Sequence, residues 1–271
     1  MEQATNSESV KLECCLEGIE SAIQAVQGGA HRMELCANLS QGGVTPSIGD
    51  IEEAVSAAKG SGTAVHVLIR PRPGDFVYSQ REKKARCENF NVMAKDVAAA
   101  LKAGAHGVVI GALLEKGGID KEITAELIRV ARATAAPCSC SITFHRAFDC
   151  CATEATAALE TLMRLLGVDR VLTSGRAESA WAGRDTITRL VEAGQGRIVV
   201  IPGAGISRTN VKQLLIHTGA KEVHVGSGCH ENIPWGSPRQ SSVSLGPSEG
   251  PSAVIRRVSR RLVSEILNTL A

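Results

Sequence analysis

The amino-acid sequence predicts a single (β/α)8 TIM barrel, an α/β fold in which a closed ring of eight parallel strands is surrounded by helices. Short segments rich in β-branched residues alternate along the chain with longer amphipathic segments, giving eight strand candidates. Gly-Ala pairs at Gly29, Gly104 and Gly219 follow three expected helices, where glycine favours the left-handed conformation that ends a helix. The alternative is an open doubly wound sheet, but the first strand is not followed by the glycine pattern of dinucleotide-binding sheets.

The expected elements follow one another in regular order. Strands are expected at residues 11–15, 32–36, 65–70, 107–111, 141–145, 170–173, 198–202 and 221–225. Helices are expected at 17–27, 48–59, 90–103, 121–133, 154–166, 186–193 and 209–217. For the second helix, Thr45 and Pro46 supply a capping hydroxyl and a proline suited to the first helical position.

The end of the chain predicts a last amphipathic helix over residues 253–270. Val254, Val258, Leu262 and Ile266 form one apolar stripe, with four arginines off it. Docking on the barrel wall is the favoured interpretation, and contact with a membrane surface is the alternative. The segment 237–252 is rich in Ser, Pro and Gly and reads as a mobile loop. We therefore expect one domain over residues 1–271, with a flexible N-terminus at 1–9.

Composition narrows the functional classes. The 271 residues are 44% hydrophobic, enough for a full core, and the net charge of +2 argues against a nucleic-acid-binding surface. The N-terminus lacks the apolar core of a signal peptide, and no apolar run approaches a membrane span. We expect a cytoplasmic protein whose nine cysteines are thiols, most of them small core residues.

Two strands carry the same pattern, Glu-x-Cys, at Glu13 to Cys15 and at Glu34 to Cys36. Side chains alternate across a strand, so each glutamate shares a face with its cysteine. Carboxylates on the inner face of a buried strand are costly unless they are paired or used, which predicts a site. Two thiolates on adjacent strands suit a soft ion such as Cu(I), whereas zinc would need further ligands. Two ordinary buried thiols are the alternative.

Other polar residues lie at the ends of the expected strands, where barrel active sites are found. Arg70 and Arg72 after the third strand would clamp a carboxylate or phosphate, or else neutralise Glu13 and Glu34. His145 after the fifth strand suits acid–base chemistry, metal ligation or a structural role. The alternation of side chains also places the following residues inside the barrel: His66, Thr143, Glu222 and His224.

Glycine-rich loops follow the last two expected strands. Gly203-Ala204-Gly205 follows the seventh strand, and Gly226-Ser227-Gly228 follows the eighth. Backbone N–H groups in these loops bind phosphate in many barrels. Glycine is also the usual residue of any tight turn, which is the alternative interpretation.

With these motifs in view, the chain resembles the CutC copper-homeostasis family over about residues 11–246. The resemblance is carried by Glu-Leu-Cys at 34–36, Gly-Gly-Val-Thr-Pro-Ser at 42–47, Ile-Arg-Pro-Arg at 69–72, Gly-Asp-Phe-Val-Tyr-Ser at 74–79, the segment 143–149, Leu-Thr-Ser-Gly at 172–175 and Pro-Gly-Ala-Gly at 202–205. It implies a TIM barrel, a cytoplasmic homo-oligomer (dimer or tetramer) and a role in copper handling. The cysteines proposed to bind Cu(I) fall on Cys15 and Cys36.

Two functional hypotheses follow. The first is a Cu(I)-binding or trafficking protein that uses Cys15 and Cys36. The second is an enzyme (a lyase, isomerase or hydrolase) in which Glu13 or Glu34 is the base and His145 the acid. Its small anionic or phosphorylated substrate would be held in one pocket by Arg70, Arg72, Arg146, Asp149, Ser174, Gly203 and Gly205.

Overall fold

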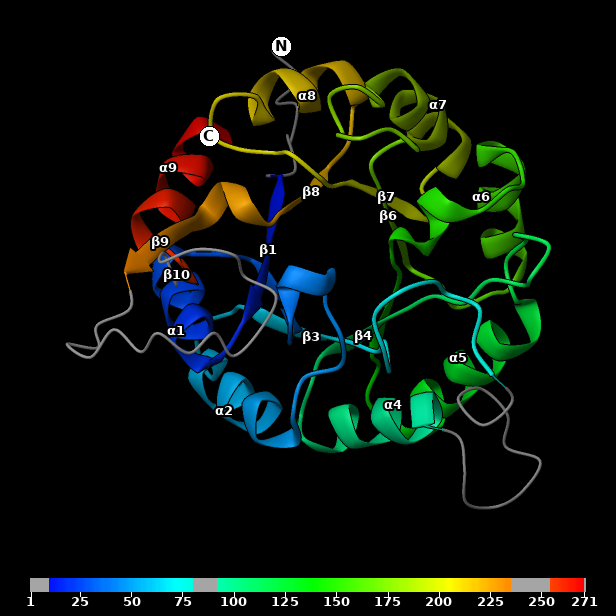
Figure 1. Cartoon of the computed structure of the whole chain (residues 1–271), viewed down its shortest axis with the longest axis horizontal. Coiled ribbons are helices and arrows are strands. Elements are labelled where there is room, and N and C mark those ends of the chain that lie inside the picture. Colours follow the sequence, from blue (N-terminus) through cyan, green and yellow to red (C-terminus); the bar gives the residue numbers. More distant parts are fainter. Residues whose placement is uncertain (1–9, 80–91, 235–253, 271) are drawn as a thin grey trace, which may run out of the picture.

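The computed structural model describes residues 10–79, 92–234 and 254–270, and its parallel strands form one sheet rolled into a barrel (Figure 1). The strands are β1 (Lys11–Glu17), β2 (Arg32–Cys36), β3 (Ala64–Leu68), β4 (Gly107–Ile110), β5 (Ser141–Phe144), β6 (Arg170–Thr173), β7 (Val199–Pro202) and β8 (Glu222–Val225). Their bounds lie within two residues of those expected. The predicted (β/α)8 barrel is confirmed.

The strand order is β7-β6-β5-β4-β3-β2-β1-β8, and all of the pairs in it are parallel. β7 and β8 lie beside each other and complete the ring. In the ladders, Glu13 of β1 is opposite both Arg32 of β2 and His224 of β8. This register brings the polar inner faces of the three strands together.

Helices form the outer layer of the barrel. They are α1 (Ile19–Gly28), α2 (Ile48–Ala58), α4 (Val92–Lys102), α5 (Lys121–Ala135), α6 (Ala155–Arg164), α7 (Arg184–Gly194), α8 (Val211–Thr218) and α9 (Arg260–Leu270). The first two residues expected in the helix 90–103 lie outside the described residues. No helix in the described part of the chain combines the length and apolar composition that crossing a membrane would require.

The helix ends follow local chemistry. Gly29 and Gly219 have positive φ angles and close α1 and α8, as the Gly-Ala pairs predict. α2 begins at Ile48, as expected, but its N-cap is Ser47, two residues after Thr45; the Ser47 hydroxyl accepts from the Asp50 N–H at 3.1 Å. The Thr45 hydroxyl instead accepts from the Arg70 N–H at 2.9 Å and ties the loop after β2 to the end of β3.

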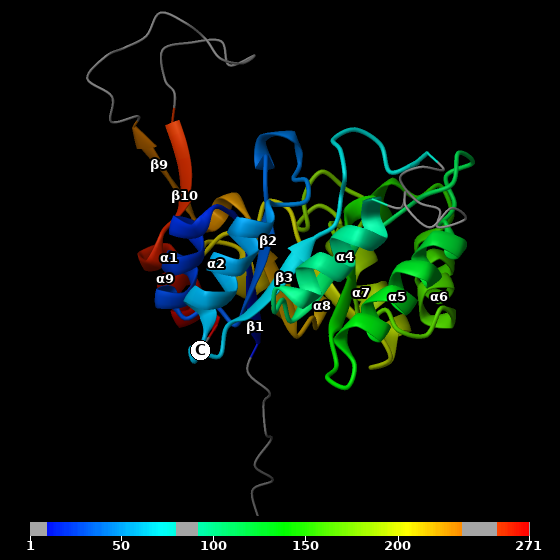
Figure 2. The same ribbon diagram turned by 90° about the horizontal axis from the view of Figure 1, so that it is seen from below.

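The expected helix over 253–270 is wrong in its first part. The segment Val254–Val258 is a strand, β10, which pairs antiparallel with β9 (His230–Pro234). Figure 2 shows this two-stranded ribbon projecting beyond the barrel beside α1 and α9. The loop expected at 237–252 and the N-terminal residues 1–9 lie outside the described residues.

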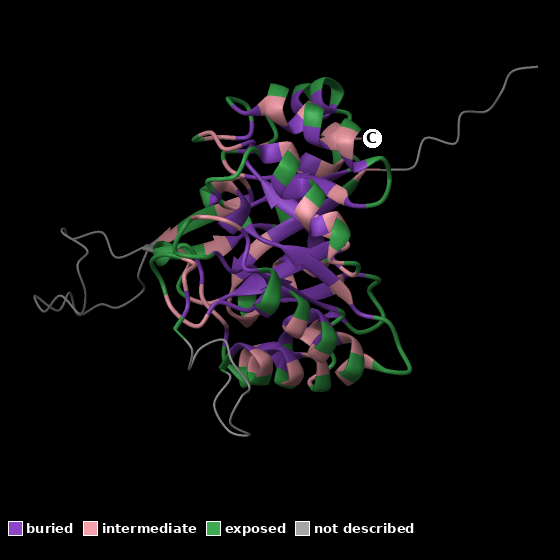
Figure 3. Cartoon of the chain, turned by 90° about the vertical axis from the view of Figure 1, so that its right-hand side faces the viewer, coloured by how far each residue is buried: buried purple, intermediate pink, exposed green. Residues whose placement is uncertain are grey.

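The main core lies between the barrel and the helices. Leu12, Met33, Leu35 and Val65 point outward from their strands and are fully buried against the helix layer. In Figure 3 the buried strands occupy the centre and the exposed residues lie on the outer helices. A second, small apolar cluster, with Cys36, Leu68 and Val109, lies inside the barrel. The rest of the barrel interior is largely polar.

Candidate functional site

Charged side chains from four strands form a buried network inside the barrel. The Arg32 guanidinium donates to Glu13 and, at 2.6 Å, to Glu222. Arg170 of β6 also donates to Glu222, at 2.9 Å. Buried charges are tolerated when they are paired and hydrogen-bonded, as these are. The network therefore holds Glu13 in place, and it is Arg32, not Arg70 or Arg72, that neutralises it.

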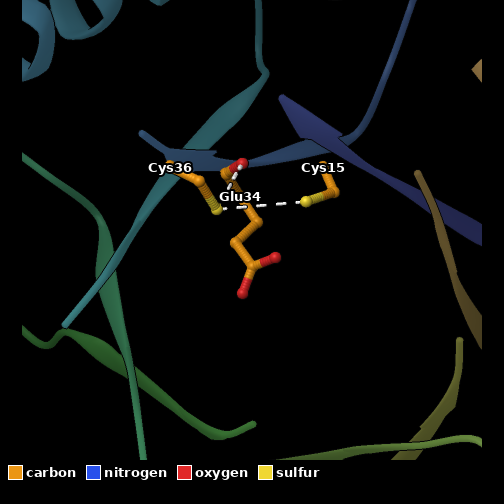
Figure 4. A group of neighbouring side chains, drawn as sticks. All are labelled: Cys15, Glu34 and Cys36. Carbon is orange, nitrogen blue, oxygen red and sulfur yellow. Dashed lines mark hydrogen bonds between the residues drawn. The ribbon is translucent and has the colours of Figure 1, made fainter. Parts of the chain in front are cut away.

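Next to this network, the two Glu-x-Cys cysteines meet. The Sγ atoms of Cys15 and Cys36 are 3.9 Å apart, and a Glu34 carboxylate oxygen lies within 4.8 Å of both. Figure 4 shows the two sulfurs facing each other, with the Glu34 side chain extending away below them. Cys36 and Glu34 are buried, whereas Cys15 is half-buried. We call Cys15, Glu34 and Cys36 the thiol cluster.

His224 connects the thiol cluster to the charged network. Its Nδ1 lies 2.7 Å from Glu13 Oε1, and its Nε2 lies 3.8 Å from Glu34 Oε2. Its imidazolium also interacts electrostatically with the Cys15 thiolate. Gly203 makes room for this ring, since a Cβ there would come within 2.7 Å of Leu172 and 3.3 Å of His224.

The electrostatics of the cluster favour charge on Cys15 and His224. The hydrogen bond with Cys36 lowers the pKa of the Cys15 thiol well below its usual value; burial opposes this, and contacts with His224 add to it. Burial alone would lower the pKa of His224, but its bonds to Cys15 and Glu13 raise it well above the ordinary value. The Cys15 contact and burial raise the pKa of Cys36, which therefore stays a thiol.

The two glutamates differ in charge. Burial raises the pKa of Glu34 well above its usual range, and the neighbouring Cys15 adds to this rise. Burial acts in the same direction on Glu13, but Arg32 and His224 outweigh it and hold the pKa of Glu13 well below the ordinary value. Glu13 is therefore an anion that orients His224, while Glu34 favours its neutral form.

The predicted acid, His145, lies in a different group of contacts. Its Nδ1 accepts from the Ala147 N–H at 3.1 Å, and its ring packs on Phe76 with ring centroids 5.0 Å apart. The Arg70 guanidinium also lies over the Phe76 ring, with Cζ 4.9 Å from the ring centroid. The partner that the structure gives to Glu13 is His224, in place of the expected His145.

The remaining arginine candidates bind groups of their own or a neighbouring loop. Arg72 donates to the carboxylate of Asp75 at 3.1 Å and to the Val77 carbonyl at 2.7 Å. Arg146 donates to Asp149 at 2.8 Å and to the Ser174 hydroxyl at 3.0 Å.

Asp149 in turn accepts from the Ser174 N–H at 3.0 Å, which ties the loop after β5 to the loop after β6. In the loop after β7, the Gly203 N–H donates to the Thr173 carbonyl, and Gly205 has a φ of 69°. The candidates that sequence gathers into one pocket are thus divided among separate clusters of contacts.

Two residues that organise the site are absent from the functional hypotheses that the sequence suggests. The alternation of side chains places His224 inside the barrel without indicating a role, and Arg32 has no role in either hypothesis. Arg32 shares the alternation of Glu34 and Cys36 in β2, which was the available signal. That it joins Glu13 to Glu222 depends on the register of β1, β2 and β8, which the sequence of one strand does not contain.

Residues 10–229 match the model of the CutC family. The human copper homeostasis protein cutC homolog is 41% identical over 260 residues, covering 96% of this chain and 88% of the human protein. A CutC family protein from Vibrio vulnificus strain CMCP6 is 43% identical over 217 residues, covering 80% of each chain.

Solved structures agree with the fold. The crystal structure of a CutC protein from Streptococcus agalactiae superposes with a TM-score of 0.71 at 30% identity, covering 80% of this chain and 98% of that one. Thiamine phosphate pyrophosphorylase from Pyrococcus furiosus has a TM-score of 0.54 at 14% identity, covering 97% and 96%. The second likeness shows the barrel fold alone.

Proposed function

Because this chain belongs to the CutC family of copper homeostasis proteins, we propose that it binds and passes on Cu(I) through Cys15 and Cys36. The observation that carries the proposal is the 3.9 Å separation of the two sulfurs. Metal–sulfur bonds of about 2.3 Å allow two sulfurs that share one ion to lie at most about 4.6 Å apart. The two thiols can therefore share one ion with little movement.

The strand register favours a bridging ion over a disulfide. Cys15 lies opposite Glu34, so Cys36 is its diagonal neighbour two residues along β2. Strand spacing and rise place diagonal Cα atoms about 8 Å apart. A disulfide needs Cα atoms no farther apart than about 7 Å, so that bond would require the backbone to move.

The donor set favours a soft monovalent ion. Thiolate sulfurs select Cu(I), whereas a closed zinc site takes four ligands. Among the described residues, one group of three or more potential metal ligands comes together, and it is the thiol cluster. Its third member, Glu34, favours the neutral form and is a poor ligand in that form.

A competition assay tests the copper proposal. Metal-free, reduced protein would be titrated with Cu(I) against the chelator bicinchoninate. We expect one Cu(I) per chain, and we expect Cys15→Ser/Cys36→Ser to lose tight binding. The matched control is Cys138→Ser/Cys150→Ser, which removes two exposed cysteines and should leave the affinity unchanged. Equal affinity of the two double variants would place the copper site elsewhere.

A second candidate function is an enzyme acting on a small anionic substrate. It is favoured by the three neighbouring side chains of Cys15, His224 and Glu13. A nucleophile whose charge is stabilised by a histidine that a carboxylate orients is a recurrent arrangement in covalent catalysis. Here Glu13 is 2.7 Å from His224 and is held by Arg32. The half-buried Cys15 would be the nucleophile.

Alkylation kinetics test this candidate without a known substrate. We expect iodoacetamide to modify Cys15 of the metal-free protein faster than the exposed Cys138 and Cys150, because the thiolate is the reactive form. His224→Gln keeps a polar side chain but removes the cation, and it should slow Cys15 modification about tenfold. Peptide mapping by mass spectrometry gives the rate at each site. Faster modification of Cys138 or Cys150 would contradict an activated Cys15.

A further inference from the structure

Arg70 is a buried cation that has no carboxylate partner among the described residues. Arg70 is 6% exposed. Its guanidinium donates to three backbone carbonyls: Gln41 at 3.3 Å, Gly43 at 2.8 Å and Gly74 at 2.7 Å. Over residues 10–79, 92–234 and 254–270 no carboxylate pairs with it, whereas the buried Arg32 has two. A buried charge without a partner of opposite sign is expensive. The Nε–H of Arg70 also has no hydrogen-bond acceptor in this part of the chain.

His145 presents a second unused donor. It is 5% exposed, and burial together with the nearby Arg70 lowers its pKa to about 3, so the ring is neutral. Its Nδ1 accepts from the Ala147 N–H, which assigns the proton to Nε2. That Nε2–H has no acceptor among the described residues. A buried donor without an acceptor generally costs a protein about 1–3 kcal/mol of folding stability, so its presence here calls for an explanation.

Arg70 and His145, which carry the two donors, contact the same aromatic ring. The Phe76 ring packs against both side chains, 4.9 Å from Arg70 Cζ and 5.0 Å from the His145 ring. Two residues before His145, on the same inward face, Thr143 is 1% exposed and its hydroxyl also lacks a partner within the described segments. The Phe76 ring is thus flanked by a buried cation and a buried neutral donor, and a third buried group without a partner in the described segments lies two residues before His145.

We propose that Arg70, His145 and Thr143 bind a small oxyanion, a carboxylate or a phosphate, beneath Phe76. The anion supplies the negative charge that Arg70 lacks and accepts from Arg70 Nε–H and His145 Nε2–H. A neutral histidine donates to such an oxygen without adding charge.

This site is separate from the thiol cluster but adjoins it. Gly43 lies between them: its carbonyl accepts from Arg70, and a Cβ built on it would sit 3.6 Å from Cys36 Sγ. The oxyanion proposal does not depend on copper binding. The two proposals can therefore fail independently.

Calorimetric titration of metal-free protein tests the proposal, with inorganic phosphate in one arm and oxalate in the other. We expect one of the two to bind at one site per chain, and the arm that binds identifies the ligand class. His145→Asn retains an oxygen that can cap Ala147 but removes the Nε2 donor, and it should weaken binding about tenfold. The matched control is His106→Asn, since His106 Nδ1 also accepts a backbone N–H, that of Val65.

Further variants keep the proposal falsifiable if His145→Asn folds poorly. Thr143→Val preserves shape and removes only the hydroxyl, so it should fold normally and weaken anion binding. Cys15→Ser/Cys36→Ser should bind the anion as the unmodified protein does, which separates this proposal from the copper proposal. Absence of binding in both arms would overturn the oxyanion site. Binding that is unchanged in both His145→Asn and Thr143→Val would overturn it as well.

Discussion

Gly111, which directly follows β4, shows how single residues shape the barrel interior. A Cβ at this position would overlap the His145 ring atoms Cε1 and Nδ1. Gly111→Ala should therefore destabilise the protein by about 1–3 kcal/mol, the usual cost of overpacking, as measured by urea unfolding. In a His145→Ala background the overlap disappears, and the cost should fall.

The control for this prediction is Gly118→Ala. A Cβ at Gly118 would meet no atom closer than 3.9 Å, so we expect a change within about 0.5 kcal/mol. A double-mutant cycle isolates the Gly111–His145 interaction. A cost for Gly111→Ala that is the same with and without His145 would show that backbone conformation, and not the histidine, requires glycine.

At the same scale, the alternation of side chains predicted much of the site. It placed Glu13 with Cys15 and Glu34 with Cys36 on inward faces, and the structure brings the two cysteines together. It could not predict that Glu13 pairs with His224, because partners across a barrel depend on the register of several strands. Nor could it predict that Arg70 donates to the carbonyls of its own neighbouring loops.

At the scale of elements, the strands and helices of the barrel were predictable because short β-branched segments alternate with amphipathic ones, and because several helices end at a glycine or begin at a capping residue. The ribbon β9–β10 was not. Val254 and Val258 are four residues apart, a spacing that fits one face of a helix and, being even, also one face of a strand. Pairing with β9, which is distant in sequence, decides between the two. The sequence pattern of residues 254–258 alone does not indicate that pairing.

For the whole molecule, the buried titratable groups predict how stability depends on pH. Burial and neighbouring arginines lower the pKa of both His66 and His145 to about 3, from an ordinary value of 6.5. Between these values the unfolded chain binds a proton at each histidine and the folded protein does not. Stability therefore falls as the pH is lowered through this window, by about 1.4 kcal/mol per pH unit for each histidine.

Other groups in the barrel modify this profile in known directions. The raised pKa of Glu34 acts in the opposite sense above pH 4.5, since the folded protein then retains a proton that the unfolded chain has lost. The lowered pKa values of Glu13 and Glu222 add to the loss of stability below about pH 4.5. The raised pKa of His224 contributes stability that is lost as the pH rises above 6.5. From pH 5 to 6 the two neutral histidines and Glu34 therefore act together with His31 and His230, whose pKa values burial also lowers, and with Cys15.

The slope of the unfolding free energy against pH can be compared between a variant and the unmodified protein. The difference reports only the titratable groups that the substitution removes. Unfolding free energies would be measured in urea at several pH values from 5 to 6. His145→Asn should reduce the slope of stability against pH by about 1.4 kcal/mol per pH unit, because it removes one proton-binding group of the unfolded chain. Thr143→Val alters the same part of the barrel without removing a titratable group and should keep the original slope. An unchanged slope in His145→Asn would mean that His145 is protonated in the folded barrel, and the neutral donor required by the oxyanion site would be lost with it.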